Sequence, residues 1–305
     1  MKLYAAPLQG FTEAPWRNFH QEIFGGVDAY FTPFVRVDKG EFRNRDLRDI
    51  APESNTVSRL VPQLIASTPA ELERLAGLFV KMGYKEADIN MGCPFPLVAG
   101  RHKGSGILPY PAEVEALLKE LVHYPELRFS VKMRLGWERA DEWRVLLPWL
   151  NAAPLQRITL HPRIGRQQYK GETDRASFAA FYSECVHPLV YNGDLLTVDD
   201  IRRVEEEFPR LEGVMLGRGL LARPALACEY AGGTIFSSHE LYDKVKLFHA
   251  RLFRYYEARL QGDAQLLAKV KPYWEYLLPD ADRKAKKAIK KAATVDKYLA
   301  TVEQL

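Results

Sequence analysis

Cys93 lies between Gly92 and Pro94, where an apolar segment gives way to a loop rich in glycine and basic residues. Glycine and proline on either side indicate that the chain leaves regular structure there, so the thiol is expected at a loop rather than in a packed core. A thiol in that position can act as a nucleophile or as a proton donor, and the residue types alone leave both roles open. Gly104 and Gly106 would let the loop close over a substrate.

Lys132 interrupts the otherwise apolar segment 128–135, where an unpaired ammonium group is costly to bury. Three interpretations are open: an ion pair that stabilises the fold, a Schiff-base lysine of the aldolase kind, or a cation beside a reduced cofactor ring. His161 is followed by Arg163 at the end of another apolar segment, and a structural and a functional role are about equally supported for this histidine.

Two glycine-containing turns could hold a phosphate. Asn192, Gly193 and Asp194 follow one apolar segment, and Gly217 and Arg218 follow the next. Glycine lets a ligand approach the backbone closely, and arginine adds charge and several donors, although an ordinary tight turn is the alternative. The histidines form no cluster with cysteines or carboxylates, so we expect no metal site.

Short apolar segments must position these groups. They lack strict alternation, as is typical of strands buried on both faces of a parallel sheet, and they cover residues 2–8, 29–35, 59–66, 86–92, 128–135, 156–162, 188–192 and 212–217. Segments with helical periodicity lie between them, most clearly at 68–83, 110–124 and 197–208. This alternation predicts an α/β fold, a (β/α)₈ TIM barrel, whose strand ends would bring the polar groups together. An open doubly wound sheet is the rival, but no strand is followed by its G-x-G-x-x-G motif.

The pattern changes after residue 236. Helical segments follow without strands, at 239–262, 264–279 and 280–305, and they carry an excess of lysine and arginine over acidic residues. We therefore predict a catalytic barrel over residues 1–236 and a small C-terminal all-helical domain over residues 237–305. The charge excess suggests an anionic partner for the second domain.

Composition places the chain among ordinary globular proteins. Of its 305 residues 47% are hydrophobic and 27% charged, and no apolar run approaches the length of a membrane span. The beginning of the sequence lacks the apolar core of a secretory signal. Three widely spaced cysteines suit a reducing compartment, so we expect a cytoplasmic protein, with no membrane association and no evident protein partner.

Taken together, seven motifs closely resemble the tRNA-dihydrouridine synthase family of flavoproteins, in its bacterial form. They are A-P-x-x-G at 6–10, P-Q-L at 62–64, N-x-G-C-P at 90–94, V-K-x-R at 131–134, H-x-R at 161–163, N-G-D at 192–194 and G-R-G at 217–219. Each is weak alone, and their order and spacing along the whole chain make the match specific. Leu8 departs from the methionine of many members, and the glycine pattern of the loop after Cys93 also differs.

The resemblance implies a barrel that carries FMN and reduces a uridine of the tRNA D-loop to 5,6-dihydrouridine with NADPH. Cys93 would be the general acid that gives a proton to carbon 5 after hydride has reached carbon 6. The residues implied for the cofactor are Pro7, Leu8, Gln9, Gln63, Lys132, His161, Asn192, Gly193, Asp194, Gly217 and Arg218. Those expected to contact the uracil or the tRNA are Asn90, Arg134, Arg163, Tyr169, Arg36, Arg283, Lys287, Lys290 and Lys291.

The lysines near the C-terminus fall on one helix face, with Ala281, Ala285 and Ile289 on the other. A solvated surface is the usual explanation of such a run, and the family resemblance favours contact with RNA instead. A dihydroorotate dehydrogenase-like reductase of a free pyrimidine would share the flavin residues and the cysteine, but it needs no basic C-terminal surface. An RNA-binding module with a degenerate barrel is a second rival, and it would purify without colour.

Overall fold

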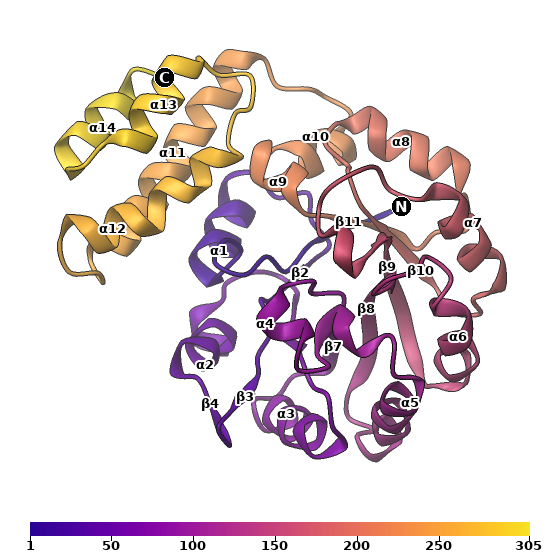
Figure 1. Ribbon diagram of the computed structural model, residues 1–305. Coiled ribbons are helices and arrows are strands. Elements are labelled where there is room, and N and C mark those ends of the chain that lie inside the picture. The colour runs from indigo at the N-terminus through magenta and orange to yellow at the C-terminus, as the bar shows by residue number, and fades with distance from the viewer.

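The computed structural model describes residues 1–305 and contains a closed parallel barrel with helices around it (Figure 1). The barrel strands are β1 (Lys2–Ala5), β2 (Ala29–Phe31), β5 (Leu60–Val61), β6 (Gln63–Leu64), β7 (Glu86–Met91), β8 (Arg128–Gly136), β9 (Leu155–Ile164), β10 (Leu189–Asn192) and β11 (Gly213–Leu216). They lie in the order β5-β2-β1-β11-β10-β9-β8-β7-β6, and every neighbouring pair is parallel. The predicted (β/α)₈ barrel is thereby confirmed.

The predicted third strand, 59–66, closes the barrel in two parts. β5 pairs with β2, whereas β6 pairs with β7, so the two ends of the sheet meet within one stretch of chain. Pro62 lies between the parts and has no N–H to donate to a neighbouring strand. The N–H of Gln63 donates instead to Oγ1 of Thr32 at 3.0 Å, which holds the two halves in register with the chain after β2.

Helices cover the outside of the barrel (Figure 1). The main ones are α1 (Ala14–Ile23), α3 (Pro69–Lys81), α5 (Pro111–Lys119), α6 (Trp143–Ala152), α7 (Arg175–Glu184), α8 (Val198–Glu207), α9 (Arg218–Ala222) and α10 (Leu226–Gly232). Short elements in the connections are the hairpin β3 (Val37–Asp38) and β4 (Glu41–Phe42), α2 (Asn44–Ile50), η1 (Pro52–Ser54), α4 (Pro96–Ala99), η2 (Gly104–Ile107), η3 (Glu120–His123) and η4 (Gly165–Gln167). The three helices predicted most clearly are present, but the one predicted over 110–124 ends as an α-helix at Lys119 and continues as the 3-10 helix η3.

Threonines cap the start of two of those helices. The side chains of Thr68 and Thr197 accept hydrogen bonds from backbone N–H groups in the first turns of α3 and α8. In α8 the carboxylate of Asp200 accepts in return from the N–H of Thr197, which completes a capping box.

The C-terminal region is helical and packs beside α1 (Figure 1). It contains α11 (Ser238–Glu257), α12 (Gly262–Val270), η5 (Lys271–Glu275), α13 (Arg283–Lys291) and α14 (Val295–Glu303). The predicted last helix, 280–305, is wrong in one respect: it is two helices. Ala292 has non-helical backbone angles, φ −56° and ψ 125°, and Thr294 caps the start of α14. No helix has both the length and the apolar character that a membrane crossing needs.

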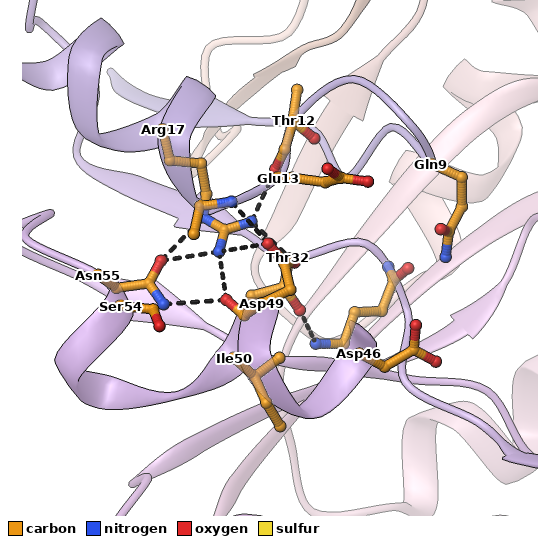
Figure 2. A network of polar contacts seen from close by, with 12 residues as sticks. Gln9, Thr12, Glu13, Arg17, Thr32, Asp46, Asp49, Ile50, Ser54 and Asn55 are labelled. Atoms are coloured by element: carbon orange, nitrogen blue, oxygen red, sulfur yellow. Dashed lines mark hydrogen bonds and ion pairs between the residues drawn. The ribbon is translucent and has the colours of Figure 1, made fainter. Parts of the chain in front are cut away.

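A buried arginine joins α1 to the loop that precedes it, to the last turn of α2 and to the segment after α2 (Figure 2). The guanidinium of Arg17 is fully buried and donates to the backbone oxygens of Thr12 and Asp49, each at 2.7 Å. It also donates to Oδ1 of Asn55 at 2.7 Å and to the carboxylate of Asp49. The network fixes the end of loop 7–13, which reaches the carboxyl end of the barrel.

Candidate functional site

A cavity of about 800 Å³ lies at the carboxyl ends of the barrel strands. Most of the residues that the sequence singled out for a site line it: Pro7, Leu8, Gln9, Arg36, Asn90, Cys93, Lys132, Arg134, His161, Tyr169, Asn192, Gly193, Asp194, Gly217 and Arg218. They come from connections far apart along the chain, and the barrel brings them to one end. The volume suits a cofactor-sized ligand, since small-molecule pockets usually measure about 300–1,000 Å³.

The loop after β1 forms one wall, and the C-terminal helices hold it. The N–H of Leu8 donates to Oγ1 of Thr12 at 2.8 Å, which keeps the loop compact. Lys269 donates to the backbone oxygen of Gly10 at 3.1 Å, and the hydroxyl of Tyr273 donates to that of Phe11 at 2.7 Å. The helical region therefore supports a wall of the cavity.

Cys93 is fixed by its backbone on both sides. Its N–H donates to Oδ1 of Asn90 at 2.9 Å, and its carbonyl oxygen accepts from the N–H and the hydroxyl of Ser105, each at 3.0 Å. Gly104 has φ +60°, and a Cβ there would lie 2.5 Å from the Cys93 oxygen. Gly104 and Gly106 are both buried. Because neither has a Cβ, the loop packs closely against Cys93 and α4.

The Cys93 side chain is a protonated thiol near neutral pH. It packs beside Phe34, Ile65 and Val98, and burial raises its pKa above the ordinary value for cysteine. The nearby charge of Arg134 lowers the pKa by less. A protonated thiol is an acid and a poor nucleophile, so the environment favours proton donation.

Positive charge dominates the cavity wall. Lys132 reaches into it from β8, and burial lowers the pKa of its ammonium group to about 8, with the charge of Arg134 acting in the same direction. Arg134 is itself held by the backbone oxygens of Gly92 and Ile164, at 3.0 and 2.9 Å. Asp194 is the only carboxylate among the lining residues. The cavity is therefore suited to an anionic ligand.

His161 is neutral and has a defined tautomer. Burial lowers its pKa well below the ordinary value, and the surrounding guanidinium and ammonium groups lower it further. Its Nε2 lies 3.0 Å from a nitrogen of Arg163. Because a guanidinium only donates, Nε2 accepts and Nδ1 carries the hydrogen.

Asp194 bridges two arginines at the ends of β9 and β11. Its carboxylate accepts from both terminal nitrogens of Arg163, and from Arg218 at 2.8 Å. The guanidinium carbon of Arg218 also lies 4.6 Å from the ring centre of Tyr169. Arg218 is thus oriented at the first residue of α9, next to Gly217, where a phosphate could be held.

Several predicted residues lie away from the cavity wall. Gln63 is fully buried and bonded to Asp88 and Asn90, and Arg163 is buried behind His161 and Asp194. Arg283, Lys287, Lys290 and Lys291 lie on α13; they are exposed and form no ion pair. Lys286, on the same helix, instead donates to the backbone oxygens of Leu277 and Leu278.

Sequence reasoning missed other lining residues. Phe34 and Met215 supply apolar surface from the barrel, and Tyr276 reaches the cavity from the C-terminal region. Phe95 follows Cys93 by two residues and is 57% exposed. Its place in the motif after the cysteine was the available signal, whereas nothing in the sequence around Tyr276 indicated a contact with the barrel.

Comparisons with known proteins bear on the family of this chain. The sequence model described as "Dihydrouridine synthase (Dus)" matches residues 4–304. The chain is 29% identical over 227 residues to tRNA-dihydrouridine synthase B of Pseudomonas aeruginosa, covering 73% of this chain and 67% of that protein. It is 28% identical over 227 residues to tRNA-dihydrouridine synthase B of Escherichia coli K12, covering 73% and 69%.

Solved structures share the fold at much lower identity. A structure of morphinone reductase in complex with tetrahydroNAD superposes with a TM-score of 0.54 at 10% identity, over 77% of this chain and 88% of that one. The old yellow enzyme from Trypanosoma cruzi gives a TM-score of 0.53 at 10% identity, over 77% and 89%. At such identity these likenesses bear on the barrel architecture alone.

Proposed function

Because this chain belongs to the dihydrouridine synthase family, we propose that it reduces a uridine in the D-loop of tRNA to 5,6-dihydrouridine. We further propose FMN as its resident cofactor, NADPH as its reductant, Cys93 as its proton donor and the cytoplasm as its location. The single observation that carries the proposal is one cavity that holds the thiol of Cys93, the amide of Asn90 and the unpaired ammonium group of Lys132 together.

The donor set of the cavity fits a flavin mononucleotide. Arg218 and the backbone at Gly217 would hold the phosphate, and Lys132 would face the polar edge of the ring system. Lys132 supports this because its ammonium group lies in a cavity and no hydrogen bond or ion pair to the protein satisfies it. When bound and reduced, the flavin would supply hydride to carbon 6 of the uracil.

Cys93 and Asn90 would act on the base itself. The thiol would donate its proton to carbon 5 of the uracil, and a solvent proton would then restore it. Asn90 lines the same cavity, and only one hydrogen of its amide nitrogen is used by the protein, in the bond to Gln63 at 2.7 Å. The second hydrogen is available to a carbonyl oxygen of the uracil. The base must leave the folded tRNA to arrive there, as enzymes that act on bases require.

The tRNA itself would be bound mainly through phosphates. Arg36, which lines the cavity, and the exposed cations of α13 would contact the phosphate backbone, since folded RNA is recognised largely by shape and phosphate contacts. The C-terminal region, residues 237–305, would serve as the tRNA-binding domain.

Replacing Lys287, Lys290 and Lys291 by alanine should weaken tRNA binding and flatten its dependence on salt. Each lost phosphate contact lowers the slope of log affinity against log salt by roughly 0.7–0.9. The slope is measured by filter binding or fluorescence at several salt concentrations, and the flavin content should stay unchanged. A matched control replaces three exposed lysines near the opposite end of the barrel, Lys81, Lys85 and Lys119. Equal slopes for wild type and the α13 variant would remove α13 from the interface.

The proposed function is tested with purified protein, NADPH, FMN and tRNA from cells that lack dihydrouridine. Mass spectrometry of the digested tRNA should show one D-loop uridine heavier by two hydrogens. Reduction of free orotate or uracil without any change in tRNA would instead identify a reductase of small pyrimidines. A protein that binds tRNA but holds no flavin would be an RNA-binding module.

A further inference from the structure

A buried chain of hydrogen bonds leads from the interior of the barrel to Cys93. The carboxylate of Asp88, on β7, is fully buried and accepts from Nε2 of Gln63 at 2.7 Å. Oε1 of Gln63 accepts from Nδ2 of Asn90 at 2.7 Å. Oδ1 of Asn90 then accepts from the N–H groups of Gly92 and Cys93, at 3.0 and 2.9 Å.

The direction of this chain is set at both of its ends, by the carboxylate of Asp88 and by the backbone N–H groups of Gly92 and Cys93. An ionised carboxylate can only accept, so Gln63 must turn its NH₂ group toward Asp88 and its oxygen toward Asn90. Asn90 must then turn its NH₂ group toward Gln63, which leaves its oxygen for the two backbone N–H groups. With either amide reversed, two oxygens or two N–H groups would face each other at close range. The N–H groups of Gly92 and Cys93 can only donate, so they require the same orientation of Asn90 from the other end, and Asp88 secures the NH₂ side of the chain through Gln63.

The orientation of the Asn90 amide has two effects on the cavity. Its oxygen fixes the backbone of Cys93, and so the place from which the thiol extends. Its nitrogen retains a second hydrogen beside the cavity, where the uracil is proposed to bind. Ser105 holds the Cys93 carbonyl from the other side, so loss of the Asn90 contact would release one of two attachments.

We propose that Asp88 is a positioning residue, which through Gln63 holds the amide of Asn90 in place and thereby places the Cys93 thiol. The catalytic consequence rests on the proposed function, whereas the effect on the thiol does not. Asp88 touches no ligand itself, since it lies outside the cavity wall.

Asp88 could alternatively act by its charge, because Lys132 lies near enough to interact with it. Asp88→Asn separates the two possibilities. Asparagine keeps an oxygen that can accept from Gln63, and its NH₂ group can donate to the hydroxyl of Ser130, which now donates to the other carboxylate oxygen at 2.6 Å. Asp88→Val removes both the charge and the acceptor at similar volume.

The experiment compares wild type with Asp88→Asn, Asp88→Val and Gln63→Met, and uses Ser130→Ala as the matched control. Ser130 contacts the same carboxylate but lies outside the path to Cys93. The first measurement is the rate of Cys93 alkylation by iodoacetamide at fixed pH, followed by peptide mass spectrometry so that Cys185 and Cys228 are scored separately. The second is turnover of dihydrouridine-free tRNA, with kcat and KM determined separately.

Asp88→Val and Gln63→Met should alkylate at Cys93 several-fold faster than wild type and should lose about 10- to 100-fold in kcat, since small displacements of a reacting group have effects of that size. Asp88→Asn should stay close to wild type in both measurements, and so should Ser130→Ala. If Asp88→Val fails to fold, Gln63→Met carries the same test.

Two results would overturn the proposal. One is an alkylation rate at Cys93 that is the same in Gln63→Met, Asp88→Val and wild type. The other is an Asp88→Asn variant as impaired as Asp88→Val, which would assign the role to charge. If wild type fails to modify tRNA, the proposed function fails, while the alkylation series still decides the positioning role.

Discussion

Cys93→Ala is expected to lower the rate of dihydrouridine formation by about 10²- to 10⁴-fold, the usual contribution of a positioned general acid. The alanine variant keeps the backbone contacts to Asn90 and Ser105, because both involve only main-chain atoms of residue 93. Flavin content and tRNA affinity should therefore stay near those of wild type. The rate is measured by mass spectrometry after a single addition of tRNA that lacks dihydrouridine.

The pH dependence of the wild type should follow the protonated thiol. Burial raises the pKa of Cys93, so the acid form persists through neutral pH and is lost only as pH rises through that elevated value. Activity should accordingly be retained at neutral pH and decline in alkaline solution. For the Cys93→Ala measurement, Cys185→Ala is the control and should keep the wild-type rate, because Cys185 is half-buried and lies outside the cavity. Full turnover of fresh tRNA by Cys93→Ala would eliminate the proton-donor role.

The sequence was sufficient for the barrel because apolar segments without alternation are typical of strands buried on both faces. The family resemblance drawn from seven motifs is likewise confirmed. The break of the third strand was less visible, since Pro62 lies within an apolar segment and only the closed topology separates β5 from β6. The break between α13 and α14 was readable in principle, because Thr294 followed by Asp296 is an N-terminal helix signal.

The candidate site shows where residue types stop being informative. Strand ends predict which side chains reach the carboxyl end of the barrel, but not which of them a neighbour withdraws from the cavity. Gln63 is bonded to Asp88 and Arg163 to Asp194, and both partners are distant in sequence. Tyr276 enters the cavity only because the C-terminal helices pack beside loop 7–13. Such contacts depend on tertiary packing, which one sequence does not specify locally.

Arg17→Met is expected to destabilise the protein by about 3–5 kcal/mol, the usual cost of removing one partner from a buried ion pair. Methionine fills part of the volume, but it leaves the carboxylate of Asp49 without its counter-charge and the backbone oxygens of Thr12 and Asp49 without a donor. The free energy of unfolding in urea measures the change. Since Arg17 holds the end of loop 7–13, flavin affinity should also fall (Figure 2).

The loss should depend on pH in a defined direction. Burial already raises the pKa of Asp49, and Arg17 opposes that rise. Without Arg17 the folded-state pKa rises further above the unfolded value of about 3.9, so the folded variant gains protons more readily than the unfolded chain. Its stability deficit is therefore smallest in acid, where Asp49 is protonated, and grows as pH rises toward neutrality.

Two further variants separate the buried charge from simple loss of packing. Arg17→Met combined with Asp49→Asn should recover part of the lost stability, because asparagine removes the uncompensated charge and can still accept from the N–H of Ala14, now 2.6 Å from Asp49. Arg139→Met removes an exposed partner of Asp141 and should leave the free energy of unfolding unchanged. A double variant no more stable than Arg17→Met, at every pH, would show that the deficit comes from lost packing and unpaired backbone oxygens rather than from the carboxylate of Asp49.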